Sequence, residues 1–157
     1  MGTRSSIAVK HGNNIKAVYC HWDGYLEHNG AILLESYDSA KANNLVALGD
    51  ISFLNRKIGE KHPFSPHSTS KSPAKQVRIR QAHEAAELAG WTTFYGRDRG
   101  ETGCEFRTFG SESEWVEHYD NVGAEYYYLM DNGVWYVSTP DDGNFVPLHE
   151  AMERLEA

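Results

Sequence analysis

The strongest constraint on the fold is a turn signal, DNG at residues 131–133, that separates two β-prone runs, residues 124–130 (AEYYYLM) and 134–139 (VWYVST). Asn and Gly accept the positive φ angles of a tight two-residue turn, and the flanking runs are rich in aromatic and β-branched residues. The pattern therefore predicts an antiparallel hairpin near the end of the chain.

Two further hairpins follow from weaker signals of the same kind. Residues 5–10 and 15–22 are β-prone and enclose HGNN, whereas residues 91–96 and 103–109 enclose RDRGET. Together the three hairpins predict an α+β fold, with a mostly antiparallel sheet of about six strands and with helices packed on one face.

Helical patterns occupy much of the remaining sequence. An apolar period of 3.6 residues marks residues 29–37, and a second helix is expected after Asp38 or Ser39, either of which can act as an N-cap. Three more helix starts are indicated by a Ser-Pro pair, a capping box and a proline, at positions 72–73, 111–114 and 147.

The length of 157 residues is typical of one domain, so residues 1–157 are expected to form a single domain. No apolar run is long enough to cross a membrane, and the first residues lack the features of a signal or transit peptide. We therefore expect a cytoplasmic protein without a membrane partner. Residues 59–72 contain two prolines and four serines and are expected to form an exposed loop.

Charge is distributed unevenly along the chain, whose net charge is −7. Residues 56–80 contain seven basic residues and one acid, whereas residues 110–157 contain eleven acids and one arginine. Because the whole chain is acidic, a nucleic-acid partner is disfavoured. The basic segment suits an acidic patch on another protein, whereas carboxylates at Glu112, Glu114 and Glu117 would imitate a nucleic-acid backbone if they shared one face. The alternative is an acidic surface that only keeps the protein in solution.

The run YCHWDGY at residues 19–25, followed by His28, brings a thiol, imidazoles and a carboxylate together in sequence. Neighbouring residues of a strand point to opposite faces, so Cys20 and His21 cannot form a thiolate–imidazolium pair. A metal site from His21, Asp23 and His28 is a weak alternative, because the spacing matches no common metal motif. The structural interpretation is a core strand followed by a turn at Asp23, and a catalytic role for His21 and Asp23 remains the alternative.

A second polar cluster, GRDRGE at residues 96–101, places Arg97 and Arg99 on either side of Asp98. Guanidinium groups at a hairpin tip bounded by glycines suit phosphate or carboxylate groups. Arg97, Asp98, Arg99 and Glu101 are therefore candidate binding residues. The structural alternative is an internal ion pair in which an arginine joins the loop to the sheet.

Tyrosines are concentrated in the last predicted hairpin, where strand alternation places Tyr126 and Tyr128 on one face and Tyr127 on the other. Because the predicted helices cover one face, a stripe of tyrosine is expected to be exposed or to be buried in a homodimer. Tyr126 and Tyr128 are therefore candidate binding residues. The alternative is a sheet covered on both faces, with the loop at residues 59–72 as the second cover.

Several segments together resemble a known group of proteins. MGTRSSIAVKHG, AVYCHWDGYLEHNGAILLESY, IGEKHPF, FYGRDRGE and GAEYYYLMDNGVWY are similar to segments of small uncharacterised proteins encoded by tailed bacteriophages. The similarity covers both ends and the middle of the chain and leaves out mainly residues 63–90. It implies no catalytic residue and no cofactor, but it implies a role during infection, when small phage proteins commonly bind and block host proteins.

We therefore expect a non-enzymatic phage accessory protein, without a cofactor, that binds a host protein in the cytoplasm of the infected bacterium. The expected partner is a nucleic-acid-handling protein or a CRISPR-type antiviral defence complex, which the protein would inhibit. The alternative is a protein that binds or hydrolyses a nucleotide or phosphoester, with Arg97 and Arg99 holding phosphate and His21 as general base.

Overall fold

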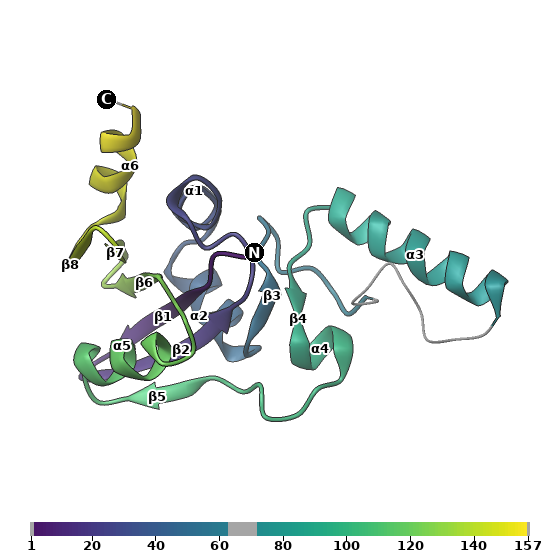
Figure 1. Ribbon diagram of the computed structural model, residues 1–157, viewed down its shortest axis with the longest axis horizontal. Helices are drawn as coiled ribbons and strands as arrows, with labels where there is room; N and C mark the ends of the chain where they lie inside the picture. Colours follow the sequence, from purple (N-terminus) through teal and green to yellow (C-terminus); the bar gives the residue numbers. More distant parts are fainter. Residues whose placement is uncertain (1, 63–71, 157) are drawn as a thin grey trace.

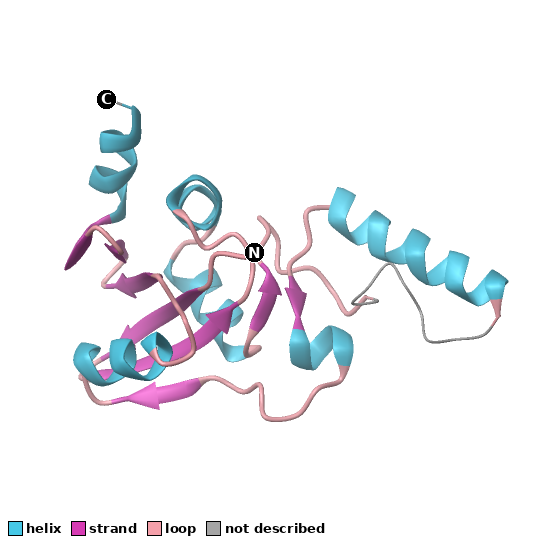
Figure 2. Cartoon of the chain, viewed as in Figure 1, coloured by secondary structure: helices cyan, strands magenta, loops and turns pink. Residues whose placement is uncertain are grey.

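The computed structural model describes residues 2–62 and 72–156 of the chain (Figure 1). In this part, eight strands form one mixed sheet, accompanied by six helices and one π-helical turn (Figure 2). The strands are β1 (Ser5–His11), β2 (Asn14–Cys20), β3 (Ile51–Phe53), β4 (Thr93–Phe94), β5 (Arg107–Phe109), β6 (Tyr126–Asp131), β7 (Val134–Thr139) and β8 (Asp142–Pro147). The helical elements are η1 (Leu26–Gly30), α1 (Ala31–Ser36), α2 (Ser39–Ala47), α3 (Pro73–Leu88), α4 (Tyr95–Arg99), α5 (Glu112–Asp120) and α6 (Leu148–Glu156). The α+β class is confirmed.

Two of the three expected hairpins are present. β1 and β2 pair antiparallel around a turn in which Gly12 has a φ of 59°. β6 and β7 pair antiparallel around Asn132 and Gly133, whose φ angles are 51° and 83°. Both turns form where the sequence supplies residues that accept the left-handed conformation with little strain.

The prediction of a third hairpin, from residues 91–96 and 103–109, is wrong. Tyr95–Arg99 forms the short helix α4, while β4 pairs with β3 and β5 pairs with β2. The Asp98 carboxylate accepts a hydrogen bond from the Phe94 N–H at 2.8 Å and stabilises this helical turn. Bonding between a side chain and the local backbone has therefore overridden the β-prone character of the segment.

The strand order is β4-β3-β2-β1-β6-β7-β8, and β5 pairs with β2 beside this path. Most neighbours are antiparallel, but β1 runs parallel to β6 and β2 parallel to β3. The described sheet is thus mixed and has eight strands rather than about six. A parallel neighbour requires a crossover connection, and the chain reaches β6 after passing through α5.

Helices cover both faces of the sheet, which corrects the expectation of one covered face. Ile7 and Val18 lie in the core on the side of η1, α1, α2 and α6, whereas Ala8 and Ala17 pack with residues of α5. The consecutive apolar residues of β1 are the local reason, because a strand buried on both faces needs apolar side chains on both.

The predicted helix starts are confirmed. Asp38, Ser72 and Ser111 are the N-caps of α2, α3 and α5, and each side chain accepts a hydrogen bond from a backbone N–H three residues later. Glu114 also accepts a bond from the Gly110 N–H at 3.2 Å, which completes the capping arrangement of α5.

α3 extends away from the sheet (Figure 1). Its buried residues are His83 and Ala86, and Leu88 near its end is 90% exposed. None of the helices in the described ranges is long and apolar enough to span a membrane.

The loop expected at residues 59–72 falls largely on residues 63–71, which lie outside the described residues. Of the residues before that segment, Glu60 and Lys61 are exposed and His62 is buried.

Candidate functional site

Arg97 and Asp98, two of the expected binding residues, form an internal ion pair in which the Asp98 side chain is fully buried. Arg97 donates to both carboxylate oxygens, at 2.9 and 3.1 Å. The backbone N–H groups of His62 and Phe94 donate to the same two oxygens. The remaining Arg97 donors bond to three backbone carbonyls, those of Ile58, Gly59 and Thr92. All five guanidinium N–H groups are therefore used inside the protein, as in the structural alternative.

Arg99 and Glu101 remain on the surface after α4. Their side chains are 54% and 42% exposed and form an ion pair at 3.2 Å. An exposed pair of this kind contributes little to stability, so both side chains are accessible to a partner. They do not lie at a hairpin tip, because the hairpin is absent.

The Thr93 hydroxyl, the His62 imidazole and the Asp98 carboxylate lie close together, a set that the sequence did not suggest. His62 lies 3.0 Å from Thr93 Oγ1 through Nε2 and 3.6 Å from Asp98 Oδ1 through Nδ1. All three residues are buried, and His62 Nδ1 also lies 2.8 Å from the Glu60 carbonyl, to which it donates. A nucleophile must reach its substrate, so the buried Thr93 hydroxyl has a structural role that joins β4 to the segment before residue 63.

His21, Asp23 and His28 do not assemble into a metal site. In the described residues, no group of three or more His, Cys, Asp or Glu side chains is placed to hold a metal ion. His21 Nδ1 instead lies 2.7 Å from the Tyr19 hydroxyl, and His28 Nδ1 lies 2.9 Å from Asn29 Oδ1. Asp23 adopts a φ of 56° and turns the chain after β2.

Cys20 is fully buried and is not an activated nucleophile. Its sulfur lies 3.4 Å from Asn29 Nδ2, and burial raises the pKa of its thiol to about 11. At neutral pH the residue is therefore a thiol, whereas the nucleophilic form is the thiolate.

The expected stripe of exposed tyrosine is not continuous, because Tyr128 is buried whereas Tyr126 is half-buried. Tyr128 is fully buried and its hydroxyl donates to the Gly24 carbonyl at 2.6 Å. Tyr126 is half-buried and stacks on Tyr128. Tyr127 on the opposite face is buried beside Trp115 of α5. The second cover of the sheet is thus α5.

Two of the three predicted acidic residues line one groove between α5 and β8. Glu112, Glu117 and Asp120 lie on the α5 side of this groove, which has a volume of about 550 Å³. Val116 and Phe145 add apolar surface to its lining. Glu114 does not join it, because its carboxylate caps the start of α5. Residues 112, 116, 117 and 120 all lie on α5, and of these Val116 and Asp120 were missing from the predicted binding residues.

The electrostatics of the groove favour a cationic ligand. Glu112, Glu117 and Asp120 are exposed, and none of them forms an ion pair with another residue in the described ranges. Phe145 is half-buried and stacks on Trp115 at a centroid distance of 5.6 Å, which fixes the apolar part of the groove. We name this surface the acidic groove.

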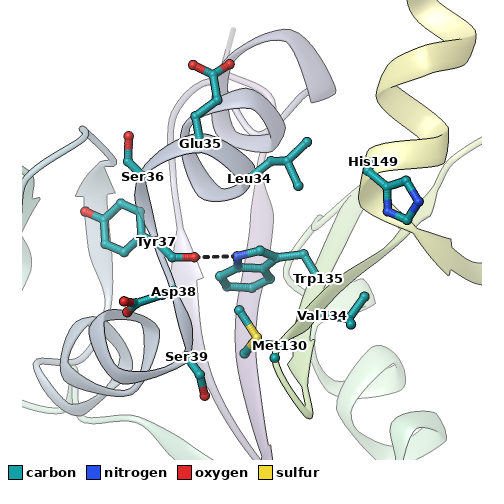
Figure 3. Close-up of a pocket in the computed structure, with 11 residues that line it drawn as sticks. Leu34, Glu35, Ser36, Tyr37, Asp38, Ser39, Met130, Val134, Trp135 and His149 are labelled. Carbon is teal, nitrogen blue, oxygen red and sulfur yellow. Dashed lines mark hydrogen bonds between the residues drawn. The ribbon is translucent and has the colours of Figure 1, made fainter.

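A larger cavity, of about 720 Å³, lies between α1, the tip of the β6–β7 hairpin and α6 (Figure 3). Trp135 lies at its centre and donates from its indole N–H to the Tyr37 carbonyl at 2.9 Å. Glu35 points away from Trp135 in Figure 3 and pairs with Arg56 at 3.1 Å, while Asp38 caps α2. The carboxylates of this cavity are therefore already engaged with other groups of the protein.

The acidic groove is the stronger candidate, because its carboxylates form no ion pair within residues 2–62 and 72–156. No protein-family model, curated protein or solved structure matches the chain. The functional interpretation accordingly depends on the geometry and charge of the chain itself.

Proposed function

We propose that this chain is a non-enzymatic phage accessory protein that binds a basic surface of a host protein through the acidic groove. The observation that carries the proposal is the alignment of Glu112, Glu117 and Asp120 in one groove without a basic partner from the described chain. Repulsion among three like charges on one helix slightly lowers the stability of the isolated protein, and the same charges attract a cationic partner.

The shape of the groove supports recognition of arginine or lysine side chains. The long aliphatic parts of these side chains can pack on Val116 and Phe145, while their charged ends meet the carboxylates of α5. A planar guanidinium group can bond to a carboxylate with two parallel hydrogen bonds, which favours arginine.

Proteins that handle nucleic acid carry arrays of basic side chains that bind phosphates. A helix with aligned carboxylates competes for such an array, so the proposed consequence of binding is inhibition of a host nucleic-acid-handling protein or an antiviral defence complex. The phage setting follows from the resemblance of the sequence segments, and the chemistry of the partner follows from the groove.

The test is a tagged pull-down from nuclease-treated bacterial host lysate, followed by mass spectrometry, with three forms of the protein. The first is the native chain, and the second carries Glu112→Lys, Glu117→Lys and Asp120→Lys. The matched control reverses the same number of charges on the exposed face of α6, at Glu150, Glu153 and Glu156. Circular dichroism of each form checks that it is folded.

We expect the native chain and the α6 control to retain one host protein in stoichiometric amount, and the groove variant to lose it. Binding should also weaken as salt is raised, because the attraction is electrostatic. Equal retention by the groove variant and the native chain would show that the groove is not the binding surface. Recovery of the tagged protein alone would refute the proposal of a stable host partner.

A further inference from the structure

A third cavity, of about 460 Å³, carries chemistry opposite to that of the acidic groove. It lies where the N-terminal segment, the end of β2 and the turn after α5 meet, and Arg4, His21 and Trp22 line it. Its volume lies within the range of pockets that hold small organic ligands. This is where the YCHWDGY run reaches the surface, because Trp22 is 42% exposed.

Arg4 is positioned by the turn after α5 and keeps most of its donors. One of its N–H groups donates to the Val122 carbonyl at 3.0 Å. A side chain at Gly123 would come within 3.1 Å of the guanidinium, and Gly123 has a φ of 90°, so glycine is required beneath it. In the described residues no carboxylate lies within ion-pair distance of Arg4, and the side chain is exposed. The guanidinium therefore has N–H donors left for an anion.

His21 supplies a second donor to the same cavity. Its Nδ1 lies 2.7 Å from the Tyr19 hydroxyl, and burial raises the pKa of Tyr19 to about 12, so this phenol keeps its proton at neutral pH. Burial and the charge of Arg4 lower the pKa of His21, which favours the neutral ring. In the tautomer in which Tyr19 donates to Nδ1, the ring carries its proton on Nε2, which meets no acceptor in the described part of the chain.

Trp22 adds a flat apolar surface beside these donors. Its indole contacts the His21 ring edge-on at a centroid distance of 4.6 Å. A side chain at Gly2 would come within 2.6 Å of the indole, so the backbone of the N-terminal segment packs closely against it. An exposed indole held in this way can stack on a planar ligand.

We infer that this cavity binds a nucleoside monophosphate, with the phosphate on Arg4 and His21 and the base stacked on Trp22. Glu125 also lines the cavity, and its carboxylate can accept hydrogen bonds from ribose hydroxyls or an exocyclic amine. The same negative charge opposes additional phosphates, so monophosphates should bind more tightly than triphosphates. The inference does not depend on the acidic groove and replaces Arg97, whose donors are all used, as the phosphate ligand.

The test is calorimetric titration with AMP, CMP, GMP and UMP, and with ATP, adenosine and inorganic phosphate as comparison probes. The variants are Arg4→Gln and Trp22→Leu, with Arg99→Gln as a matched control that removes an exposed arginine elsewhere on the surface. Thermal unfolding of each variant without ligand checks that the fold is retained. Glu125→Gln tests the selection against triphosphates.

We expect at least one monophosphate to bind, with adenosine and phosphate alone binding more weakly. Arg4→Gln should weaken binding by about tenfold or more, as loss of a charge-assisted hydrogen bond does, and Arg99→Gln should leave it unchanged. Glu125→Gln should reduce the difference in affinity between AMP and ATP. The inference is overturned if no nucleotide binds at millimolar concentration, if Arg4→Gln binds like the native chain, or if Arg99→Gln removes binding instead.

Discussion

The substitution Asp98→Asn distinguishes an internal role of the Arg97–Asp98 pair from a role in ligand binding. Each carboxylate oxygen of Asp98 accepts one bond from Arg97 and one from a backbone N–H. An asparagine replaces one of these acceptors with an NH₂ donor, whichever way its amide is turned. Two of the four bonds are then lost, and two donors face the new NH₂ group.

The expected cost follows from the burial of the pair. The Asp98 side chain is fully buried and that of Arg97 is 14% exposed, so the substitution leaves a largely buried positive charge without its counter-ion. Breaking a buried pair in this way costs roughly 3–5 kcal/mol of unfolding free energy. In a chain of this length each kcal/mol lowers Tm by about 2–4 °C, so the expected decrease is roughly 6–20 °C.

Urea denaturation followed by far-UV circular dichroism measures the change in unfolding free energy, and a thermal melt gives the change in Tm. The control is Glu101→Gln, which removes the exposed partner of Arg99 and should cost no more than about 1 kcal/mol. If Asp98→Asn also costs less than about 1 kcal/mol, the internal role is refuted. Arg97 and Asp98 would then be available for the ligand-binding role that their sequence pattern first indicated.

Two further predictions concern buried ionisable groups. Burial raises the pKa of Asp50 from 3.8 to about 6, so its contribution to stability is complete below pH 3.8 and is lost as pH rises through about 6. Urea titrations at several pH values should show that the native chain loses unfolding free energy between pH 4 and 6 relative to Asp50→Asn. Parallel curves of unfolding free energy against pH for the two proteins would contradict the raised pKa. Ellman's reagent at pH 8 should modify the half-exposed Cys104 in the folded protein but Cys20 only after denaturation, and rapid modification of both would contradict the burial of Cys20.

The parts of the fold that could be predicted are those with local causes. The turns at Gly12 and at Asn132-Gly133 and the caps at Asp38 and Ser111 each depend on residues within one turn of the chain. The pairing of β1 with β6 has no such signal, because the paired residues are more than a hundred positions apart. The parallel pair within a mostly antiparallel sheet follows from that pairing, and the sequence alone predicted neither this pair nor the full number of strands nor the second covered face.

The candidate site shows the same division between local and distant causes. Glu112 and Glu117 were candidates as acids of one predicted helix, whereas the groove that they share also needs its opposite wall, which comes from β8. Arg97 and Arg99 were candidates because they flank Asp98 in sequence, yet Arg97 is used internally. Arg4 was missed, because its relation to His21 and to the turn at Gly123 exists only after β1 and β6 pair.

Both proposed sites depend on α5, which carries the acidic groove and leads into the turn beneath Arg4. Three buried aromatic side chains attach this region to the sheet: Trp115 donates to Ser6 Oγ at 2.8 Å, Tyr119 to the Ala17 carbonyl at 3.4 Å, and Tyr127 to the Val116 carbonyl at 3.2 Å. Energetic coupling between two sites requires an element with two arrangements that both ligands bias. Close packing and these bonds hold α5 against the sheet, so we expect a basic partner in the groove and an anion on Arg4 to bind independently. The opposite charges of the two sites then suit the two proposed ligands, a basic protein surface and an anion.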